Sequence, residues 1–261
     1  MTSINAANTT SAFAGFSKLF KKEMQSWWGT KRWLIQGMVW TLGLNGLLFV
    51  ALFILPGVMA AQGETLGDPL EVGGQMFFAL GMMAVAVGVV VLSQGEVIDE
   101  RQSGTAAWIL AKPVSRSAFV LAKLLAQGLS ILVLMVLAPA ALAFVQLSIA
   151  STGGVGLMGF LAAVVITALH SIFYLTLTIM LGVVLSNRGA ILGVSLAVLL
   201  GGMLFRNLPV VGIIMPWVLP DVAGVIVADP AKLFLTPVIM TAVWAAIFLV
   251  ASLVAFERVE L

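Results

Sequence analysis

Six long runs of apolar residues constrain this chain more than any other feature of its sequence. A helix needs roughly 20 residues to cross about 30 Å of hydrocarbon. Only 9% of the 261 residues are charged, whereas a globular domain carries about 25%. We therefore predict an all-α integral membrane protein, a single domain with six transmembrane helices. We place them near residues 34–56, 74–95, 117–148, 156–185, 189–205 and 236–256.

The basic residues predict the orientation of these helices, because cytoplasmic loops are enriched in Lys and Arg. With the N-terminus inside, only Arg206 and Lys232 of the 13 basic residues fall outside. The first outer loop carries acidic residues instead. We expect a multi-pass protein of the cytoplasmic (inner) membrane with both termini in the cytoplasm. The inner basic residues are Lys18, Lys21, Lys22, Lys31, Arg32, Arg101, Lys112, Arg116, Lys123, Arg188 and Arg258.

Two segments outside the runs have their own patterns. Residues 1–15 are small and polar, and we expect them to be disordered and not to form a signal peptide. Residues 16–33 alternate Lys with Phe, Leu and Trp at helical spacing. This pattern predicts an amphipathic helix in the membrane interface. A plain positive-inside anchor for the first helix is the alternative.

Residues 206–235 are apolar but broken by Pro209, Pro216 and Pro220. Irregular backbone at membrane depth needs protein or water to cover its polar groups. We expect short re-entrant or interfacial helices on the outer face, with an ordinary surface loop as the alternative.

A few residues inside the runs are candidates for packing or transport. Gly74, Gly81, Gly88 and Gly95 recur every seven residues and form a smooth stripe for close helix packing or for a moving face. His170 is the only histidine. It is either hydrogen-bonded to a neighbouring helix or a proton relay or substrate contact. The other polar candidates for interhelical hydrogen bonds or the pathway are Asn45, Gln75, Gln127 and Gln146.

The sequence offers little enzyme chemistry. It has no cysteine and no Gly-x-x-x-x-Gly-Lys-Ser/Thr phosphate loop. No acidic pair is accompanied by a histidine that would suggest zinc. We expect no catalytic site, no metal and no cofactor bound by this chain, so any ATP-driven work needs another subunit.

The segment from Leu92 to Lys123 is a charged interruption between the second and third runs. Ser103 or Thr105 is placed to cap a short helix that contains Trp108, Ile109 and Leu110. Pro113 ends this helix, and Ser115 caps the next one. An apolar patch flanked by charge indicates contact with lipid or with a protein partner.

This segment resembles the cytoplasmic segment of ABC-2-type transporter permeases. Glu96 and Glu100 precede Gly104-Thr105, a hydrophobic stretch follows, and Pro113-Val114-Ser115-Arg116 leads on to Lys123. The resemblance implies that 96–116 is a coupling helix docking on an ATPase subunit. The candidate docking residues are Glu96, Glu100, Arg101, Gly104, Thr105, Trp108, Ile109, Lys112, Pro113 and Arg116.

The same resemblance implies a permease that pairs with a second, identical or homologous permease. Separate nucleotide-binding subunits would hold ATP and Mg. The net charge of only +2 gives no reason to expect nucleic acid as a partner. An apolar interior favours an exporter of an amphiphile. The alternatives are a secondary carrier or channel, an anchor for a cytoplasmic partner, and a hydrolase built on His170. The absence of Asp, Glu, Lys and Arg from the centres of the runs counts against an ion-driven carrier.

Overall fold

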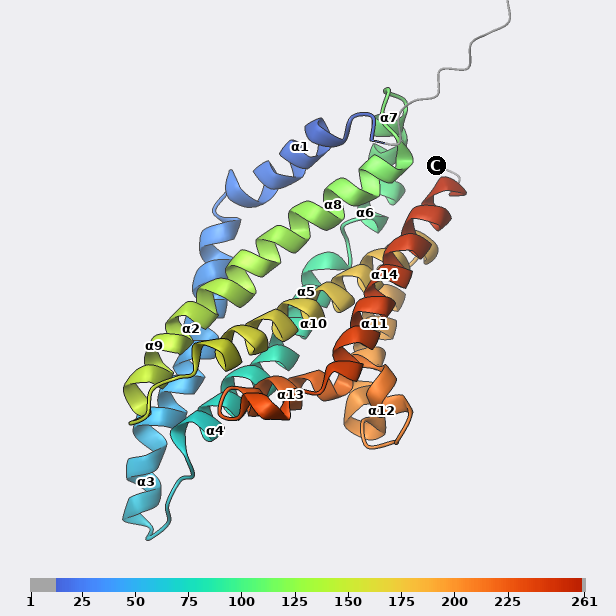
Figure 1. Ribbon diagram of the computed structural model, residues 1–261. Coiled ribbons are helices and arrows are strands. Elements are labelled where there is room, and N and C mark those ends of the chain that lie inside the picture. Colours follow the sequence, from blue (N-terminus) through green and yellow to red (C-terminus); the bar gives the residue numbers. More distant parts are fainter. Residues whose placement is uncertain (1–12, 260–261) are drawn as a thin grey trace, which may run out of the picture.

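The computed structural model describes residues 13–259, so most of the predicted disordered segment 1–15 lies outside the described residues. Every regular element within 13–259 is helical, and the long helices lie side by side in an elongated bundle (Figure 1). This confirms the predicted all-α class, since apolar segments in lipid must satisfy their backbone groups internally.

Five helices in the described part are long and apolar enough to cross a membrane. Three of them join several elements. The first contains α2 (Arg32–Phe49), η1 (Val50–Ile54) and α3 (Leu55–Ala61). The second contains α4 (Pro69–Gly74), η2 (Gln75–Leu80), α5 (Gly81–Ser93) and, after a turn, α6 (Ile98–Gln102). The third contains α8 (Arg116–Ile131), η3 (Leu132–Leu137) and α9 (Ala138–Ala150).

The fourth and fifth are the single helices α10 (Leu157–Val184) and α14 (Leu235–Glu257). The run at 189–205 forms α11 (Arg188–Phe205), which at 18 residues is the shortest of the long apolar helices. It begins at the cap residue Asn187, whose side chain accepts hydrogen bonds from the backbone N–H groups of Gly189 and Ala190.

Each of the three composite helices contains a π-helical segment, and two of these lie just before a proline. Proline lacks an N–H and its ring crowds the carbonyl four residues earlier, so a wider turn relieves the conflict. At Pro139 the helix continues after η3, and the Pro139 carbonyl accepts a hydrogen bond from Asn45 Nδ2 at 3.1 Å. The third run, which is longer than a membrane crossing requires, thus forms one helix from Arg116 to Ala150.

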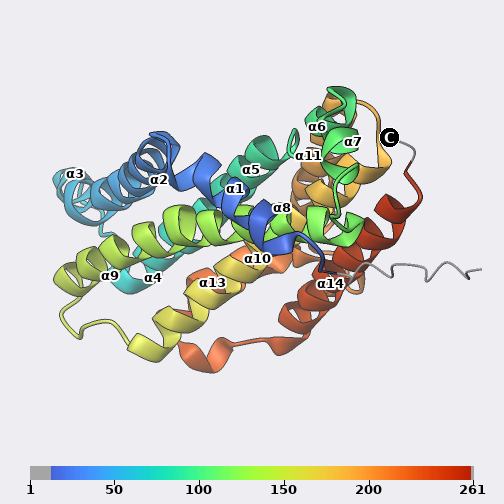
Figure 2. The same cartoon turned by 90° about the horizontal axis from the view of Figure 1, so that it is seen from above.

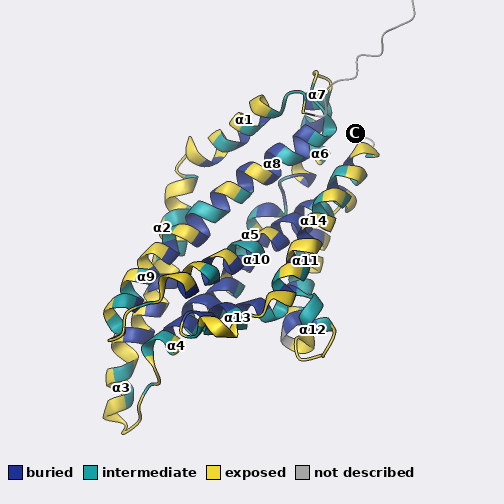
Figure 3. Cartoon of the chain, in the orientation of Figure 1, coloured by how far each residue is buried: buried dark blue, intermediate teal, exposed yellow. Residues whose placement is uncertain are grey.

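The central helix of the bundle is α10, which contacts α5, α8, α11, α13 and α14. In its apolar stretch, 67% of the residues are buried, against 17% for α14. Phe173 and Tyr174 on α10 are fully buried, and Phe160 packs edge-on against Phe78. Figure 3 shows the buried residues facing the inside of the bundle and exposed ones over much of α3 and α14.

The ends of the bundle carry different elements. One end holds α1 (Phe16–Trp28), α6, α7 (Thr105–Leu110) and the end of α14, and the opposite end holds α3, α4 and α13 (Figure 1). Viewed from above in Figure 2, α6 and α7 lie over one end of α11. Arg188 at the start of α11 pairs with Asp99 at 3.2 Å, and Arg206 at its end pairs with Asp221 at 3.0 Å. The α11 helix therefore runs from one end of the bundle to the other.

Residues 206–235 fold into short helices: α12 (Val211–Ile214), η4 (Pro216–Val218), α13 (Leu219–Ile226) and η5 (Pro230–Lys232). Two tryptophans attach them to the bundle. Trp217 Nε1 donates to the Val198 carbonyl of α11 at 2.8 Å, and Trp244 Nε1 of α14 donates to the Ile214 carbonyl at 3.0 Å. With Leu219, Ala223 and Ile226 also buried, the segment is part of the packed protein.

The glycine stripe faces several partners rather than one surface. A Cβ at Gly74 would collide with the backbone of α13, and one at Gly88 would collide with the ring of Trp40. Gly95 leaves room for Arg188 and Asp99, and Gly81 lies against Leu44. The regular spacing therefore serves close contacts with α13, α2 and α11 within one subunit.

Candidate functional site

Residues 98–115 comprise α6, α7 and the turn that leads to Ser115, and we call them the cap. The cap lies at the same end of the bundle as α1. Gly104 directly precedes α7, and its φ of +73° favours glycine. The prediction that Ser103 or Thr105 is the N-cap residue of this helix is wrong. The N-cap residue is Gly104, and no side chain of the described residues accepts a hydrogen bond from the backbone N–H groups of the first turn of the helix. The two hydroxyls instead lie 2.9 Å from each other.

The other end of the cap follows the sequence prediction. The helix α7 ends at Leu110, three residues before Pro113. Ser115 then caps α8 by accepting a hydrogen bond from the Ala118 N–H at 3.0 Å. The predicted helix over residues 16–33 is shorter than expected, since α1 ends at Trp28 and the chain turns at Gly29 before α2.

Two arginines, Arg101 in the cap and Arg116 directly after it, form hydrogen bonds with the C-terminal ends of two long helices. Arg101 Nη1 donates to carbonyls at the end of α10, those of Gly182, Val183 and Leu185, at 2.6–3.3 Å. A cation at a helix C-terminus satisfies unpaired carbonyls and is favoured by the helix dipole. A displacement of α6 must therefore either move the end of α10 or break these bonds.

Arg116, at the start of α8, does the same at the end of α14. Its Nη1 donates to the carbonyls of Phe256, Glu257 and Val259 at 2.6–3.1 Å. Ser117 adds a hydrogen bond to the Glu257 carboxylate at 2.9 Å. The two predicted docking residues Arg101 and Arg116 thus face the protein interior and connect helices.

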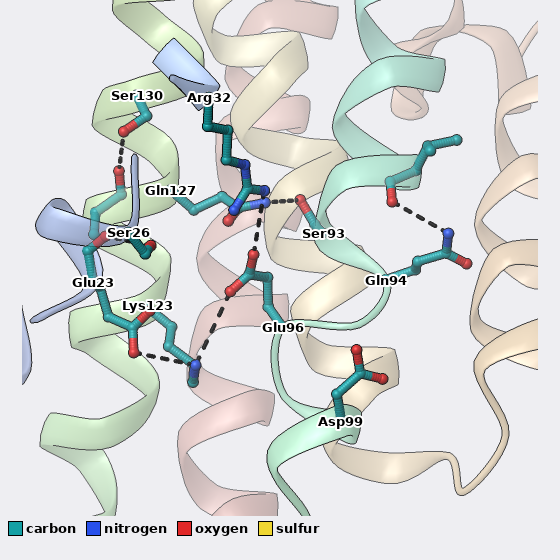
Figure 4. Close-up of polar contacts among 12 residues, drawn as sticks. Glu23, Ser26, Arg32, Ser93, Gln94, Glu96, Asp99, Lys123, Gln127 and Ser130 are labelled. Carbon is teal, nitrogen blue, oxygen red and sulfur yellow. Dashed lines mark hydrogen bonds and ion pairs between the residues drawn. The ribbon is translucent and has the colours of Figure 1, made fainter. Parts of the chain in front are cut away.

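Beneath the cap lies a cluster of ion pairs, the charge cluster, which consists of Lys22, Glu23, Arg32, Glu96, Glu100 and Lys123. Figure 4 shows Glu23, Arg32, Glu96 and Lys123 of this cluster. Its centre is Lys123, whose side chain is only 3% exposed. The Nζ atom lies 3.3 Å from Glu23, 4.0 Å from Glu96 and 3.1 Å from Glu100. These carboxylates come from α1, the turn after α5, and α6, so one lysine joins three parts of the chain to α8.

Two further cations balance the three carboxylates. Lys22 Nζ lies 3.0 Å from Glu100, and Arg32 lies 3.7 Å from Glu96 while its guanidinium stacks on Trp27 at 3.9 Å. Burial lowers the pKa of Lys22, but its hydrogen bond and charge attraction to Glu100 outweigh this and raise the pKa above its usual value. With three cations and three anions, the charge cluster carries no net formal charge, which offsets the cost of burying the Lys123 ammonium group.

The exposed tip of the cap consists of different residues. Trp108 is 64% exposed, and Lys112 Nζ lies 3.4 Å from the centre of its ring. Gly104 and Pro113 are also exposed, and Thr105 is half-buried, whereas Ile109 is buried against the bundle. The tip therefore presents an apolar ring and a positive charge to the outside.

The predicted docking residues thus separate into two groups. Those of the tip face outward, and those of the charge cluster, the arginine contacts and Ile109 face inward. Sequence reasoning missed Glu23 and Trp27, which lie buried against α8 on the helix predicted to rest in the membrane interface. The signal was available, since Glu23 is an acidic residue within a basic amphipathic pattern.

The polar residues inside the bundle have mixed environments. Gln127 Nε2 donates to Ser93 Oγ at 2.8 Å, and Gln146 Nε2 donates to Asn45 Oδ1 at 3.1 Å, so both join different helices. His170 differs, because neither ring nitrogen has a partner among the described residues. The alternative of a hydrogen bond from His170 to a neighbouring helix is therefore wrong.

Comparison with known proteins identifies the family. The family model described as ABC-2 family transporter protein matches residues 4–225, which include the charge cluster, the cap and the helices up to α13. Comparison with curated proteins gives no match. Members of this family are components of membrane transport and associate with ABC ATPase subunits. The match covers most of the chain and, together with five membrane-length helices, shows that this protein belongs to the ABC-2 transporter family.

Proposed function

We propose that the chain is the permease subunit of an ATP-driven exporter, and that the tip of the cap docks on a separate nucleotide-binding subunit. The observation that carries the proposal is the contrast within the cap. Trp108 and Lys112 face outward at the tip, while Arg101, Glu100 and the neighbouring Arg116 hold the long helices. An exposed aromatic residue beside a cation is typical of a protein contact.

The proposed topology has six transmembrane helices, with α11 as the fifth. At about 1.5 Å per residue, 18 residues extend about 27 Å, close to the hydrocarbon thickness. The ion pairs at both ends of α11 support this crossing. In this topology α1 and the end of α14 lie on the same, cytoplasmic side of the membrane. The helices α12 and α13 lie on the outer side, packed against the bundle.

The proposed mechanism moves the long helices through the cap. When nucleotide binding shifts the docked ATPase relative to the membrane, the cap moves with the ATPase. The Arg101 contacts carry this motion to α10, the Arg116 contacts carry it to α14, and Lys123 carries it to α1. Small shifts at such packed contacts switch a bundle between discrete arrangements, as alternating access requires.

A second permease completes the pathway in this proposal. Large parts of α2 and α14 are apolar and exposed, which fits contact with lipid or with another permease. No charged side chain lies near the middle of the five membrane-length helices of the described chain, which suits an amphiphilic cargo better than an ion. Export is the direction that we propose for such a cargo.

Purification from native membranes tests the docking role. We expect an ABC ATPase to co-purify with the tagged wild-type chain, and Trp108→Asp and Gly104→Pro to lose it. Lys112→Glu should weaken the complex, and Lys18→Glu, which changes an exposed lysine of α1 outside the cap, should not. If both Trp108→Asp and Gly104→Pro retain the ATPase at wild-type levels, the tip is not its docking site.

A further inference from the structure

A cavity of about 380 Å³ lies between η2, α5, α10, α11 and α13, away from the cap and the charge cluster. Its walls are apolar and include Leu80, Met83, Leu199, Trp217 and Pro220. The cavity falls within the usual size of small-molecule sites, about 300–1,000 Å³. Such sites are mostly apolar, with a few polar groups that orient the ligand.

Two polar side chains of α10 line the cavity, one helical turn apart. His170 is 1% exposed and Tyr174 is fully buried, and their ring centres lie 4.9 Å from each other. Both imidazole nitrogens lack a hydrogen-bond partner within residues 13–259, and the tyrosine hydroxyl lies near the Trp217 side chain. Buried polar groups are nearly always hydrogen-bonded, so the two imidazole nitrogens need a partner from a molecule in the cavity.

The wall opposite is fixed in place. Trp217 donates its N–H to the Val198 carbonyl, and its ring lies against Gly202, where a Cβ would come within 2.7 Å of it. The glycine lets η4 approach α11 closely and holds the indole as one side of the cavity. The cavity is therefore built by specific contacts and is not a gap between loose helices.

The charges in the lining define the chemistry of the occupant. Arg206 and Asp221, the only charged residues of the cavity lining within the described chain, pair with each other at 3.0 Å, and both are about half exposed. They leave no net charge for an ionic ligand. A neutral imidazole offers one donor and one acceptor, and a tyrosine hydroxyl offers both.

From this geometry we propose that the cavity binds a neutral amphiphile, with an apolar body of about two rings and a hydroxyl or amide that bonds His170 and Tyr174. The proposal rests on the proposed function only for the role of the site, as the place where the permease holds its cargo. Binding itself depends on the cavity alone.

The unique histidine permits a direct test. The chain, with a histidine-free tag and ¹⁵N-labelled histidine, is placed in lipid nanodiscs, where His170 gives the only imidazole signals. 4-Phenylphenol is the test ligand, and biphenyl is its control without a hydroxyl. We expect 4-phenylphenol to shift both imidazole nitrogen signals saturably and biphenyl to leave them nearly unchanged. Equal shifts with both compounds, or no shift before the membrane is saturated, would overturn the proposal.

Two pairs of variants separate site binding from partition into lipid. Leu199→Trp fills the cavity and should abolish the signal shift, whereas Val165→Trp, on the exposed side of α10, should preserve it. His170→Phe should weaken 4-phenylphenol binding about tenfold in equilibrium dialysis, the loss expected for one buried hydrogen bond. Ser252→Ala, which changes a buried hydroxyl on α14 away from the cavity, should retain wild-type affinity. Undiminished binding in both His170→Phe and Leu199→Trp contradicts the assignment.

These measurements need no ATPase, so the two proposals fail separately. If the tip variants keep their ATPase while 4-phenylphenol still binds at His170, the docking role is wrong and the ligand site stands. If the tip variants lose the ATPase but the imidazole signals do not respond, the reverse holds.

Discussion

Lys123 Nζ lies 3.1 Å from Glu100 Oε1, deep beneath a cap whose tip is exposed to the cytoplasmic side in our topology. The lysine belongs to α8 and the glutamate to α6, so this contact joins the cap to the helix that follows it. Glu23 and Glu96 meet the same ammonium group. Its removal leaves three carboxylates close together with less compensation.

We expect Lys123→Met to destabilise the protein by about 3–5 kcal/mol, the cost of breaking a buried ion pair from one side. Thermal unfolding in detergent or nanodiscs measures this as a lower Tm. Lys18→Met, an exposed lysine on α1, is the matched control and should change the Tm little. An unchanged Tm for Lys123→Met would mean that the charge cluster is not structural.

The arginine contacts make a prediction about local motion. Arg116→Gln removes the cation that holds the last carbonyls of α14, and we expect the region around Phe256 to exchange its amide hydrogens faster. A charge-assisted hydrogen bond contributes about 1.5–3 kcal/mol, so protection should fall roughly 10- to 100-fold there. Arg258→Gln, exposed at the same helix end, should leave exchange unchanged. If the amide hydrogens near Phe256 exchange at the same rate in both variants, Arg116 does not stabilise the end of α14.

Two glycines test the role of close packing. Gly88→Ala should destabilise the protein by about 1–3 kcal/mol, because a Cβ there meets Trp40 and Met135 and the core must shift. Gly43→Ala is the control, since no atom lies within 4 Å of its Cβ position and alanine favours the helix. Thermal unfolding compares the two. A Gly88→Ala variant as stable as Gly43→Ala would remove the packing argument for the stripe.

The topology is testable because the chain has no cysteine. We expect Gln62→Cys and Asn207→Cys to react with a membrane-impermeant maleimide added outside intact cells. Ser186→Cys should react only after the cells are permeabilised. If residues 186 and 207 react from the same side, α11 does not cross the membrane.

Much of the fold could be predicted from the sequence, because apolar length is a local property. The runs at 34–56 and 236–256 correspond to helices that extend from Arg32 to Ala61 and from Leu235 to Glu257. The predicted serine cap of α8 is confirmed at Ser115. The N-cap residue of α7 was not predicted, because Gly104 stands between Ser103 and Thr105 and all three residue types occur at helix N-termini. The sequence does not show which of the three takes the N-cap position.

The site could be predicted only in part, because its contacts join residues far apart in the chain. Glu23 and Lys123 are 100 residues apart, and no local pattern links them. Glu96 and Glu100 were therefore assigned to a docking surface, although both contact Lys123 within the protein. The lack of a hydrogen-bond partner for His170 within residues 13–259 could not be predicted either, because it depends on which side chains the neighbouring helices place near the imidazole.

The bonds of Arg101 and Arg116 end on main-chain carbonyls, and such acceptors are present whatever residue occupies the position. Substitutions along α10 and α14 can accumulate without disturbing these two linkages. If the cavity holds the cargo and the arginine contacts transmit the motion of the ATPase, as we propose, a lineage can acquire a new cargo by altering the cavity while it keeps the coupling contacts. Under the two proposals, specificity and energy transduction are separately evolvable traits.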